Sequence, residues 1–182
     1  MKKIMIVMMS VVIALGVFSG CSKTDGEKEK PGNASNVTLE EVYTAVKGAY
    51  GENYLPNMEI PAEMLETEFG LTKELYVEVK AEQPMIGVHA DRVVIVKAAE
   101  GKADIVEDAL VAAKEKKVSD TMQYPMNLAK IDAAKILREG EYVVFLLVGA
   151  VNDAAEPTEE EAKEFAENEV QKGVKAFNNL FK

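Results

Sequence analysis

Residues 93–118 read VVIVKAAEGKADIVEDALVAAKEKKV and contain the two patterns that decide the fold. Four β-branched residues, Val93 to Val96, predict a buried central strand that ends before Gly101. From Lys102 to Val118 the pattern changes to that of a helix with one apolar stripe and one charged face. The stripe consists of Ile105, Val106, Ala109, Leu110 and Ala113. The middle of the chain is therefore a strand followed by a helix.

On the C-terminal side, two more strands are predicted at residues 134–138 and 142–148. They are joined by Glu139-Gly140-Glu141, a tight turn in which glycine accepts the positive φ that such turns require. Thr158, followed by three glutamates, is typical of the start of a helix. We expect a β-hairpin and then a long C-terminal helix.

On the N-terminal side, Thr38-Leu39-Glu40-Glu41 is a capping box that predicts a helix running to about Gly48 or Tyr50. Pro61 is placed to open a short helix, and Gly70 to close it. Residues 71–80 are ambiguous, because Leu75, Val77 and Val79 alternate as in a strand whereas Thr72 suits the N-cap of a helix. We interpret 71–80 as a helix and leave the conformation of 71–90 open.

The order of these elements predicts the α+β class. The expected architecture is a small antiparallel sheet of three to four strands, with helices packed on one side, formed by residues 38–182. With 48% apolar and 29% charged residues, the composition is that of a globular protein with a real core.

The first 21 residues are typical of a lipoprotein signal peptide. Lys2 and Lys3 precede an uncharged run over residues 4–18, which is short for a membrane span of about 20 residues. Phe18-Ser19-Gly20-Cys21 resembles a lipobox, the site at which diacylglycerol with its palmitate-type chains is joined to a cysteine. We expect residues 1–20 to be the signal and Cys21 the lipid attachment site. The alternatives are an uncleaved anchor helix, or a plain secretory signal with an incidental thiol.

Residues 21–37 are predicted to be a flexible tether, since Ser22 to Asn36 contain no apolar residue larger than alanine. The net charge is −10. Loss of a leader that carries Lys2, Lys3 and no acid would make it −12. Such a chain repels phosphate backbones, so nucleic acid is not expected as a partner. The expected location is the extracytoplasmic face of the cell membrane, held there through the lipid on Cys21.

Two pairs of residues are candidates for a functional site. His89 is the single histidine and would lie beside Asp91 on one face of a strand, where a carboxylate can orient an imidazole. The alternative is that Asp91 only makes a turn hydrogen bond to the backbone. Tyr124, held by Pro125, could form the wall of a ligand groove together with Asn127. The alternative is a tyrosine packed under the loop, with Asn127 capping a short helix.

No metal, cofactor or catalytic constellation is predicted. The chain has one cysteine, so a cysteine-rich metal site is excluded. Glu159 to Glu161 are explained by the helix dipole at a first turn. Methionine sulfur can bind soft metal ions, but we interpret the four methionines considered for this role as side chains that fill the core: Met58, Met64, Met122 and Met126.

Several short motifs in the middle of the chain resemble a known family. They are Pro84-Met85-Ile86, Val88-His89-Ala90-Asp91, Glu100-Gly101-Lys102, Gln123-Tyr124-Pro125-Met126-Asn127, Gly140 and Tyr142-Val143. Together with their spacing over residues 38–182, they are similar to a domain of unknown function in small lipoproteins of Gram-positive anaerobic bacteria. The resemblance implies an α+β lipoprotein domain and no particular substrate.

Two functions remain open from the sequence. The first is a non-catalytic binding or interaction module with a protein or small-molecule partner of unknown identity. The alternative is a cell-envelope hydrolase that uses acidic residues such as Asp91 or Glu141. An exposed apolar patch would favour the first, and a deep pocket with a carboxylate would favour the second.

Overall fold

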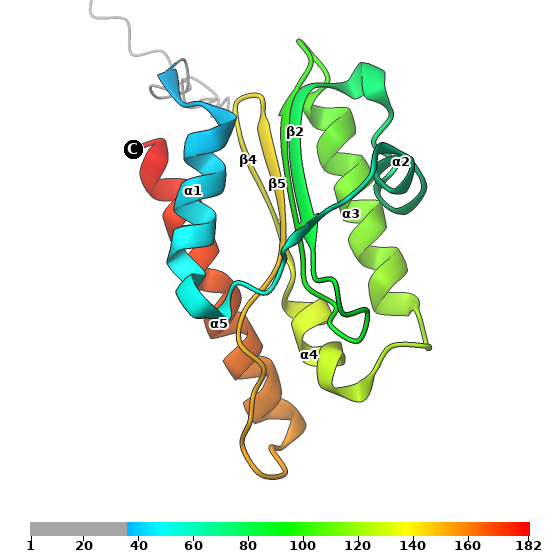
Figure 1. Cartoon of the computed structure of the whole chain (residues 1–182), viewed down its shortest axis with the longest axis vertical. Helices are drawn as coiled ribbons and strands as arrows, with labels where there is room; N and C mark the ends of the chain where they lie inside the picture. Colours follow the sequence, from blue (N-terminus) through cyan, green and yellow to red (C-terminus); the bar gives the residue numbers. More distant parts are fainter. Residues whose placement is uncertain (1–35) are drawn as a thin grey trace, which may run out of the picture. The chain divides into compact units, whose positions relative to one another are not determined.

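The β-branched run at the centre of the chain forms the middle of a five-stranded antiparallel sheet. The computed structural model describes residues 36–182, and the order of its strands is β1-β2-β3-β5-β4 (Figure 1). The predicted signal peptide, Cys21 and nearly all of the predicted tether lie outside the described residues.

The strands are β1 (Met58–Glu59), β2 (Tyr76–Gln83), β3 (Arg92–Ala98), β4 (Lys135–Glu139) and β5 (Tyr142–Leu147). In the centre, Val94 of β3 lies opposite Phe145 of β5. The predicted hairpin is confirmed, because Glu139 pairs with Tyr142 and Gly140 has a φ of 57°. A residue with a Cβ is strained at that φ, which explains the glycine.

The helices are α1 (Leu39–Tyr50), α2 (Ala62–Phe69), α3 (Ala103–Ser119), α4 (Pro125–Ala133) and α5 (Glu159–Leu180), with single 3₁₀ turns η2 (Gly51–Asn53) and η3 (Lys73–Leu75). The predicted capping box at Thr38 and the predicted helix start at Thr158 are confirmed, and Thr158 also forms a capping box. Gly70 closes α2 in the left-handed conformation, as predicted. Within residues 36–182, no helix combines the length and the apolar character needed to cross a membrane.

The α+β class is confirmed, but two details of the predicted architecture are wrong. The sheet has five strands instead of three to four, and helices cover both of its faces instead of one. Figure 1 shows α1 and α5 on one side and α2 and α3 on the other. The reason is that successive residues of a strand point to opposite faces of the sheet, and in β3 and β5 the residues that point to either face are mostly apolar. Both faces of the sheet must therefore be shielded from water.

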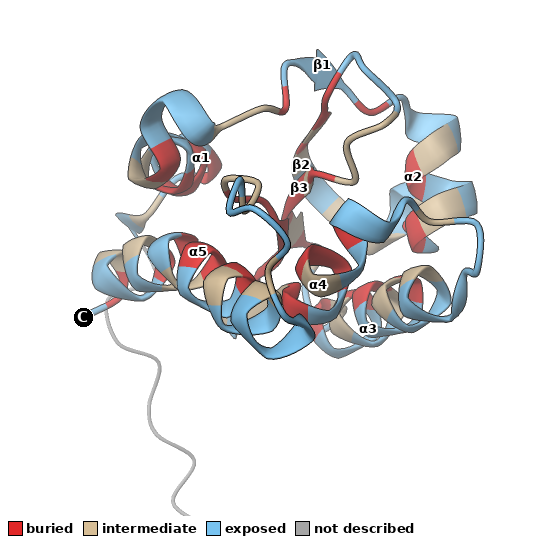
Figure 2. Ribbon diagram, turned by 90° about the horizontal axis from the view of Figure 1, so that it is seen from below, coloured by how far each residue is buried: buried red, intermediate tan, exposed pale blue. Residues whose placement is uncertain are grey.

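The two faces carry two separate cores. Alternate side chains such as Val94 and Phe145 pack toward α2 and α3, whereas Ile95 and Val144 pack toward α1 and α5. Figure 2 shows the buried residues along the strands and on the sides of the helices that face them. The sheet is thus the middle layer of three.

The prediction of a helix at residues 71–80 is wrong. Only residues 73–75 form a helical turn, and β2 starts at Tyr76. The strand-like alternation of Leu75, Val77 and Val79 indicates the observed conformation better, because β2 pairs with β3 from Tyr76 to Glu82, with Val79 opposite Val96 and a register shift between Tyr76 and Glu78. Ladder hydrogen bonds to a central strand outweighed the capping preference of Thr72.

Gly173 brings α1 and α5 into close contact over the sheet. Its N–H donates to the Tyr50 hydroxyl at 3.2 Å, and that hydroxyl donates to the Val170 carbonyl at 3.2 Å. A Cβ at residue 173 would lie 2.5 Å from the Tyr50 oxygen and 3.0 Å from a methyl group of Leu146. By contrast, a Cβ at Gly48 in α1 would meet nothing within 4 Å.

We predict opposite effects for alanine at these two helical glycines. Gly173→Ala should destabilise the protein by about 1–3 kcal/mol through overpacking. Gly48→Ala should stabilise it by about 0.5–1 kcal/mol through helix propensity. Urea unfolding of the full chain followed by circular dichroism measures both. An equal gain from the two substitutions would show that α1 and α5 do not pack this closely.

Candidate functional site

The four residues singled out from the sequence gather at one end of the sheet. His89 and Asp91 lie in the loop between β2 and β3, Tyr124 is the N-cap of α4, and Asn127 lies in the first turn of that helix. In Figure 1 this loop and α4 lie side by side at the lower end of the sheet. A hydrogen bond of 2.8 Å from Asn127 Nδ2 to the Val88 carbonyl joins them.

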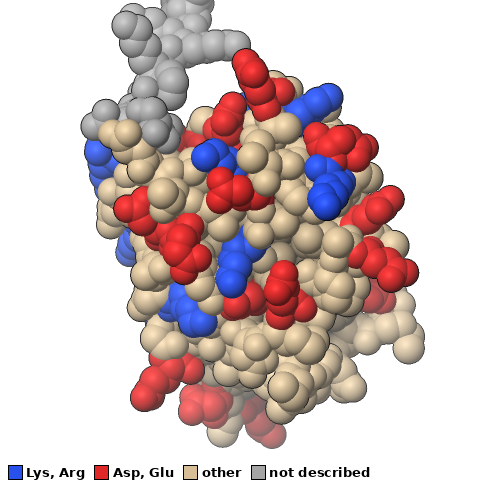
Figure 3. All heavy atoms as spheres, turned by 45° about the horizontal axis from the view of Figure 1, so that its top comes forward, with Lys and Arg blue, Asp and Glu red and all other residues tan. Residues whose placement is uncertain are grey.

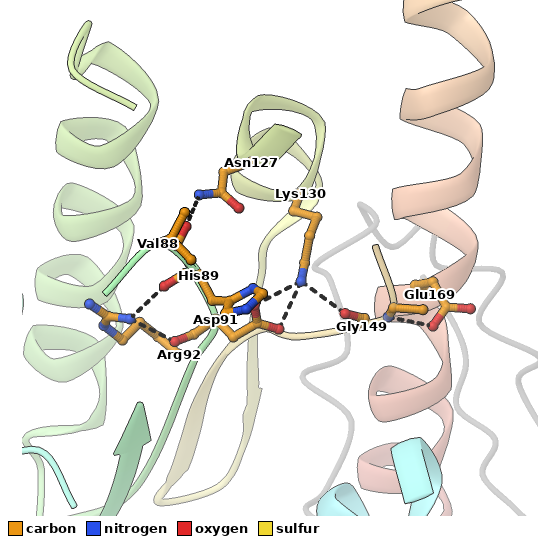
Figure 4. A network of polar contacts seen from close by, with 9 residues as sticks. Val88, His89, Asp91, Arg92, Asn127, Lys130, Gly149 and Glu169 are labelled. Carbon is orange, nitrogen blue, oxygen red and sulfur yellow. Dashed lines mark hydrogen bonds and ion pairs between the residues drawn. The ribbon is translucent and has the colours of Figure 1, made fainter. Parts of the chain in front are cut away.

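Asp91 forms a buried ion pair with Lys130. Asp91 is 0% exposed and Lys130 7%, and Lys130 Nζ lies 2.8 Å from both carboxylate oxygens. The same ammonium donates to the Gly149 carbonyl at 2.8 Å. Figure 4 shows Lys130 reaching from α4 to these two partners. The structure thus pairs Asp91 with Lys130 and not with His89, the partner considered from the sequence.

The segment after β5 connects this ion pair to α5. Gly149 passes so close to Glu169 that a Cβ at residue 149 would lie 2.6 Å from the Glu169 Cβ. The next amide, that of Ala150, donates to Glu169 Oε2 at 3.0 Å (Figure 4). Lys130 therefore holds three segments together: the β2–β3 loop, α4 and the start of the connection to α5.

The structure does not support the alternative in which Tyr124 is packed under the loop and Asn127 caps a short helix. Tyr124 is 55% exposed, so it is not packed under the loop. Asn127 is 2% exposed and does not cap α4, because it lies inside the helix and its side chain bonds to Val88. A buried asparagine that reaches a neighbouring loop fixes the position of that loop.

Three buried polar atoms at this end have no hydrogen-bond partner within the part of the chain that the structure describes. They are His89 Nδ1, Arg92 Nε and Asn127 Oδ1. Arg92 is otherwise engaged, because its Nη1 donates to the Asp91 carbonyl at 2.8 Å and lies 3.5 Å from the His89 carbonyl (Figure 4). Since buried polar groups are nearly always paired, three such atoms in one place need an explanation.

All three residues line one hollow of about 210 Å³, which we call the polar hollow. The loop contributes Gly87 and His89 and β3 contributes Arg92, while Lys117, Tyr124 and Asn127 come from the α3–α4 side. A concave site with a few converging polar groups is the usual form of a small-molecule site.

A second hollow of about 300 Å³ adjoins the first and shares Arg92 and Lys117 with it. Lys117 Nζ lies 3.4 Å from Glu68 Oε2. Burial lowers the pKa of Lys117, and the Glu68 carboxylate opposes that shift. Burial also lowers the pKa of Arg92. Desolvation therefore disfavours both charges at this place.

A third hollow of about 320 Å³ lies between α4, the 150–157 segment and α5. Its lining is mostly apolar and includes Met126, Val151 and Phe165, with Lys130 in its wall. Lys130 already makes its three hydrogen bonds to Asp91 and Gly149, so this hollow offers little polar recognition.

The two acids considered for hydrolysis are far apart. Arg92 pairs with Leu147 and Lys97 with Tyr142, so Asp91 precedes one end of β3 and Glu141 lies at the other. Five residue steps along a strand separate the ends by about 17 Å. The spacing of paired glycosidase carboxylates is about 5–9.5 Å, so Asp91 and Glu141 do not form such a pair. Within residues 36–182, no three His, Cys, Asp or Glu side chains are grouped as metal ligands.

The sequence analysis missed Arg92, Lys117 and Lys130. A lone basic residue in a helix is usually a surface residue, so Lys117 and Lys130 gave no usable signal. Arg92 directly precedes the apolar run of β3, and a charge at the edge of a buried strand is the one hint that the sequence contained.

Comparison with known proteins yields a family and no close relative. The model of a family described as "Domain of unknown function (DUF4358)" matches residues 49–148, which include the whole sheet, α2 to α4 and the polar hollow. No curated protein and no solved structure matches the chain.

Proposed function

The chain belongs to DUF4358, a family of domains of unknown function, and we propose from its own residues that it is a lipid-anchored, non-catalytic binding module. Its ligand is a small polar molecule held in the polar hollow. The module stands on the extracytoplasmic face of the cell membrane, attached through Cys21.

The observation that carries this proposal is the group of three unpaired buried atoms around one hollow. Within residues 36–182, His89 Nδ1, Arg92 Nε and Asn127 Oδ1 lack a partner. Each unpaired buried polar atom costs about 1–3 kcal/mol of stability. A ligand that pairs with them removes this cost, and its binding therefore stabilises the folded protein.

The surroundings of the polar hollow also favour binding. Six large apolar side chains are exposed on the β2–β3 loop, the α3–α4 connection and α4, and we call them the apolar rim: Met85, Ile86, Met122, Tyr124, Met126 and Leu128. Exposed apolar side chains gathered at one end of a domain are typical of a surface that contacts another molecule.

The chemistry at this end favours binding over hydrolysis. Asp91 is neutralised by Lys130 and shielded from water, so it is not available as a general base. Among the described residues, the buried Nδ1 of His89 has no hydrogen-bond partner that could orient the imidazole. A polar hollow without a nucleophile and its base is better suited to holding a ligand than to cleaving one.

The proposed anchor rests on the N-terminal sequence. The short apolar run and Ser19-Gly20-Cys21 support lipid transfer to Cys21. Two acyl chains give stable attachment to a membrane, whereas one chain gives only marginal attachment.

The anchor is tested by intact-mass spectrometry of the protein from membranes of a Gram-positive host. We predict a mature species that begins at Cys21 and carries diacylglycerol, and a Cys21→Ser variant that lacks the added mass and leaves the membrane fraction. An unmodified precursor in both samples would refute the anchor.

The binding function is tested by thermal unfolding of the full chain in detergent with a panel of small polar molecules. The panel contains free amino acids, short carboxylates, inorganic phosphate and monosaccharides. We predict that at least one class raises the Tm, because it binds only the folded state. The rise should disappear in Asn127→Ala and persist in Asn178→Ala, an exposed position on α5. A panel without any effect, or a rise that survives Asn127→Ala, would contradict the proposed site.

A further inference from the structure

We propose that the ligand of the polar hollow is a small organic anion. Its carboxylate or phosphate group lies between Arg92 and Lys117, and a hydrogen-bond donor of the same molecule pairs with Asn127 Oδ1. This inference rests on the proposed function and adds the chemical class of the ligand.

The walls of the polar hollow carry two positive charges. Arg92 and Lys117 both line the polar hollow, and no carboxylate is among its described lining residues. The chain as a whole has a net charge of −10, and on the face in Figure 3 acidic side chains are spread among the basic ones. Two cations therefore line this hollow, and the carboxylate that interacts with both of them, Glu68, lines the adjoining hollow.

Both cations can still form further hydrogen bonds. Arg92 uses Nη1 for two loop carbonyls, while its buried Nε–H has no acceptor in the described part of the protein. Guanidinium groups present their donors in a planar fork that matches a carboxylate or phosphate. Lys117 Nζ is 3.4 Å from Glu68 Oε2, longer than the usual 2.7–2.9 Å of a charge-assisted hydrogen bond.

Desolvation strengthens this argument. Burial lowers the pKa of Arg92 and of Lys117, so each cation is less stable in place than it is in water. An anion between them would stabilise both charges. Glu68 already attracts both cations, but its side chain is 31% exposed and lines the adjoining hollow instead of the polar hollow.

The orientation of the Asn127 amide is fixed. Its Nδ2 donates to the Val88 carbonyl, which can only accept, so the amide cannot be turned around. Oδ1 is therefore the atom left unpaired among the described residues, and Asn127 is one of the residues that line the hollow. A carbonyl oxygen needs a donor, so a bare anion such as acetate would satisfy only part of the site. A hydroxy acid, an amino acid or a protonated phosphate also brings an O–H or N–H.

The volume limits the size of the ligand. About 210 Å³ corresponds to roughly seven water molecules at about 30 Å³ each. This space suits a molecule of a few heavy atoms, or the end group of a longer one. The hollow is too small to enclose a polymer segment.

Isothermal titration calorimetry on the full chain in detergent tests the ligand class with three matched probes. Lactate carries both an anion and a donor, acetate lacks the donor, and lactamide lacks the charge. Inorganic phosphate is the fourth probe and distinguishes a phosphate from a carboxylate site. We predict that lactate or phosphate binds more tightly than acetate, and that lactamide binds most weakly.

Variants assign the binding to the proposed donors. Lys117→Met should weaken the binding of the preferred anion about tenfold or more, as expected for loss of a charged hydrogen bond. Lys117→Arg should retain binding. Lys175→Met removes the same charge from an exposed position on α5 and should have no effect. Equal affinity in Lys117→Met and wild type would overturn the proposal.

The outcomes separate this inference from the proposed function. If no anionic probe binds, or if lactamide binds as tightly as lactate, the anion proposal is wrong. The binding function still stands in that case if a neutral molecule raises the Tm and loses its effect in Asn127→Ala. If no molecule of either kind binds, both proposals fail.

Discussion

The buried ion pair between Asp91 and Lys130 is the interaction on which the candidate site depends. Removing two charges from water is costly, and their attraction offsets that cost only when the geometry is good and the other hydrogen bonds are made. Here Lys130 Nζ binds both oxygens of Asp91 and the Gly149 carbonyl. Asp91 belongs to the β2–β3 loop, Lys130 to α4 and Gly149 to the segment after β5. One ammonium group therefore fixes the relative positions of these three segments.

The polar hollow follows from this arrangement. Asn127 lies three residues before Lys130, so the two side chains share one face of α4, and a helix that turns Lys130 inward also turns Asn127 toward the loop. Arg92 directly follows Asp91, and its guanidinium holds the carbonyls of Asp91 and His89. The polar atoms left over by these contacts therefore meet in one place. Buried polar groups that are only partly satisfied are expensive for a fold, which is why we interpret them as part of a binding site.

The sequence predicted the fold where the signals are local. The β-branched run of β3, the capping box at Thr38, the helix start at Thr158 and the turn at Gly140 each follow from a few neighbouring residues, and all are confirmed. The prediction of a helix at 71–80 was wrong because pairing with β3 is a long-range interaction. For the site, the sequence identified four residues that the fold does bring together. It missed Lys130, the buried partner of Asp91, and the partly buried Lys117, since the segments that cover them are distant in the chain.

The most direct test of the account is hydrogen–deuterium exchange of the full chain, compared between wild type and Lys130→Met. If the ion pair holds the site together, its loss should speed exchange in residues 84–91, in α4 and in residues 149–157, while β3 and β5 remain protected. Lys163→Met is the matched control, because it breaks an exposed ion pair with Asp132 at 3.9 Å that contributes little stability. Unchanged exchange in the three segments, or the same increase in Lys163→Met, would contradict the account.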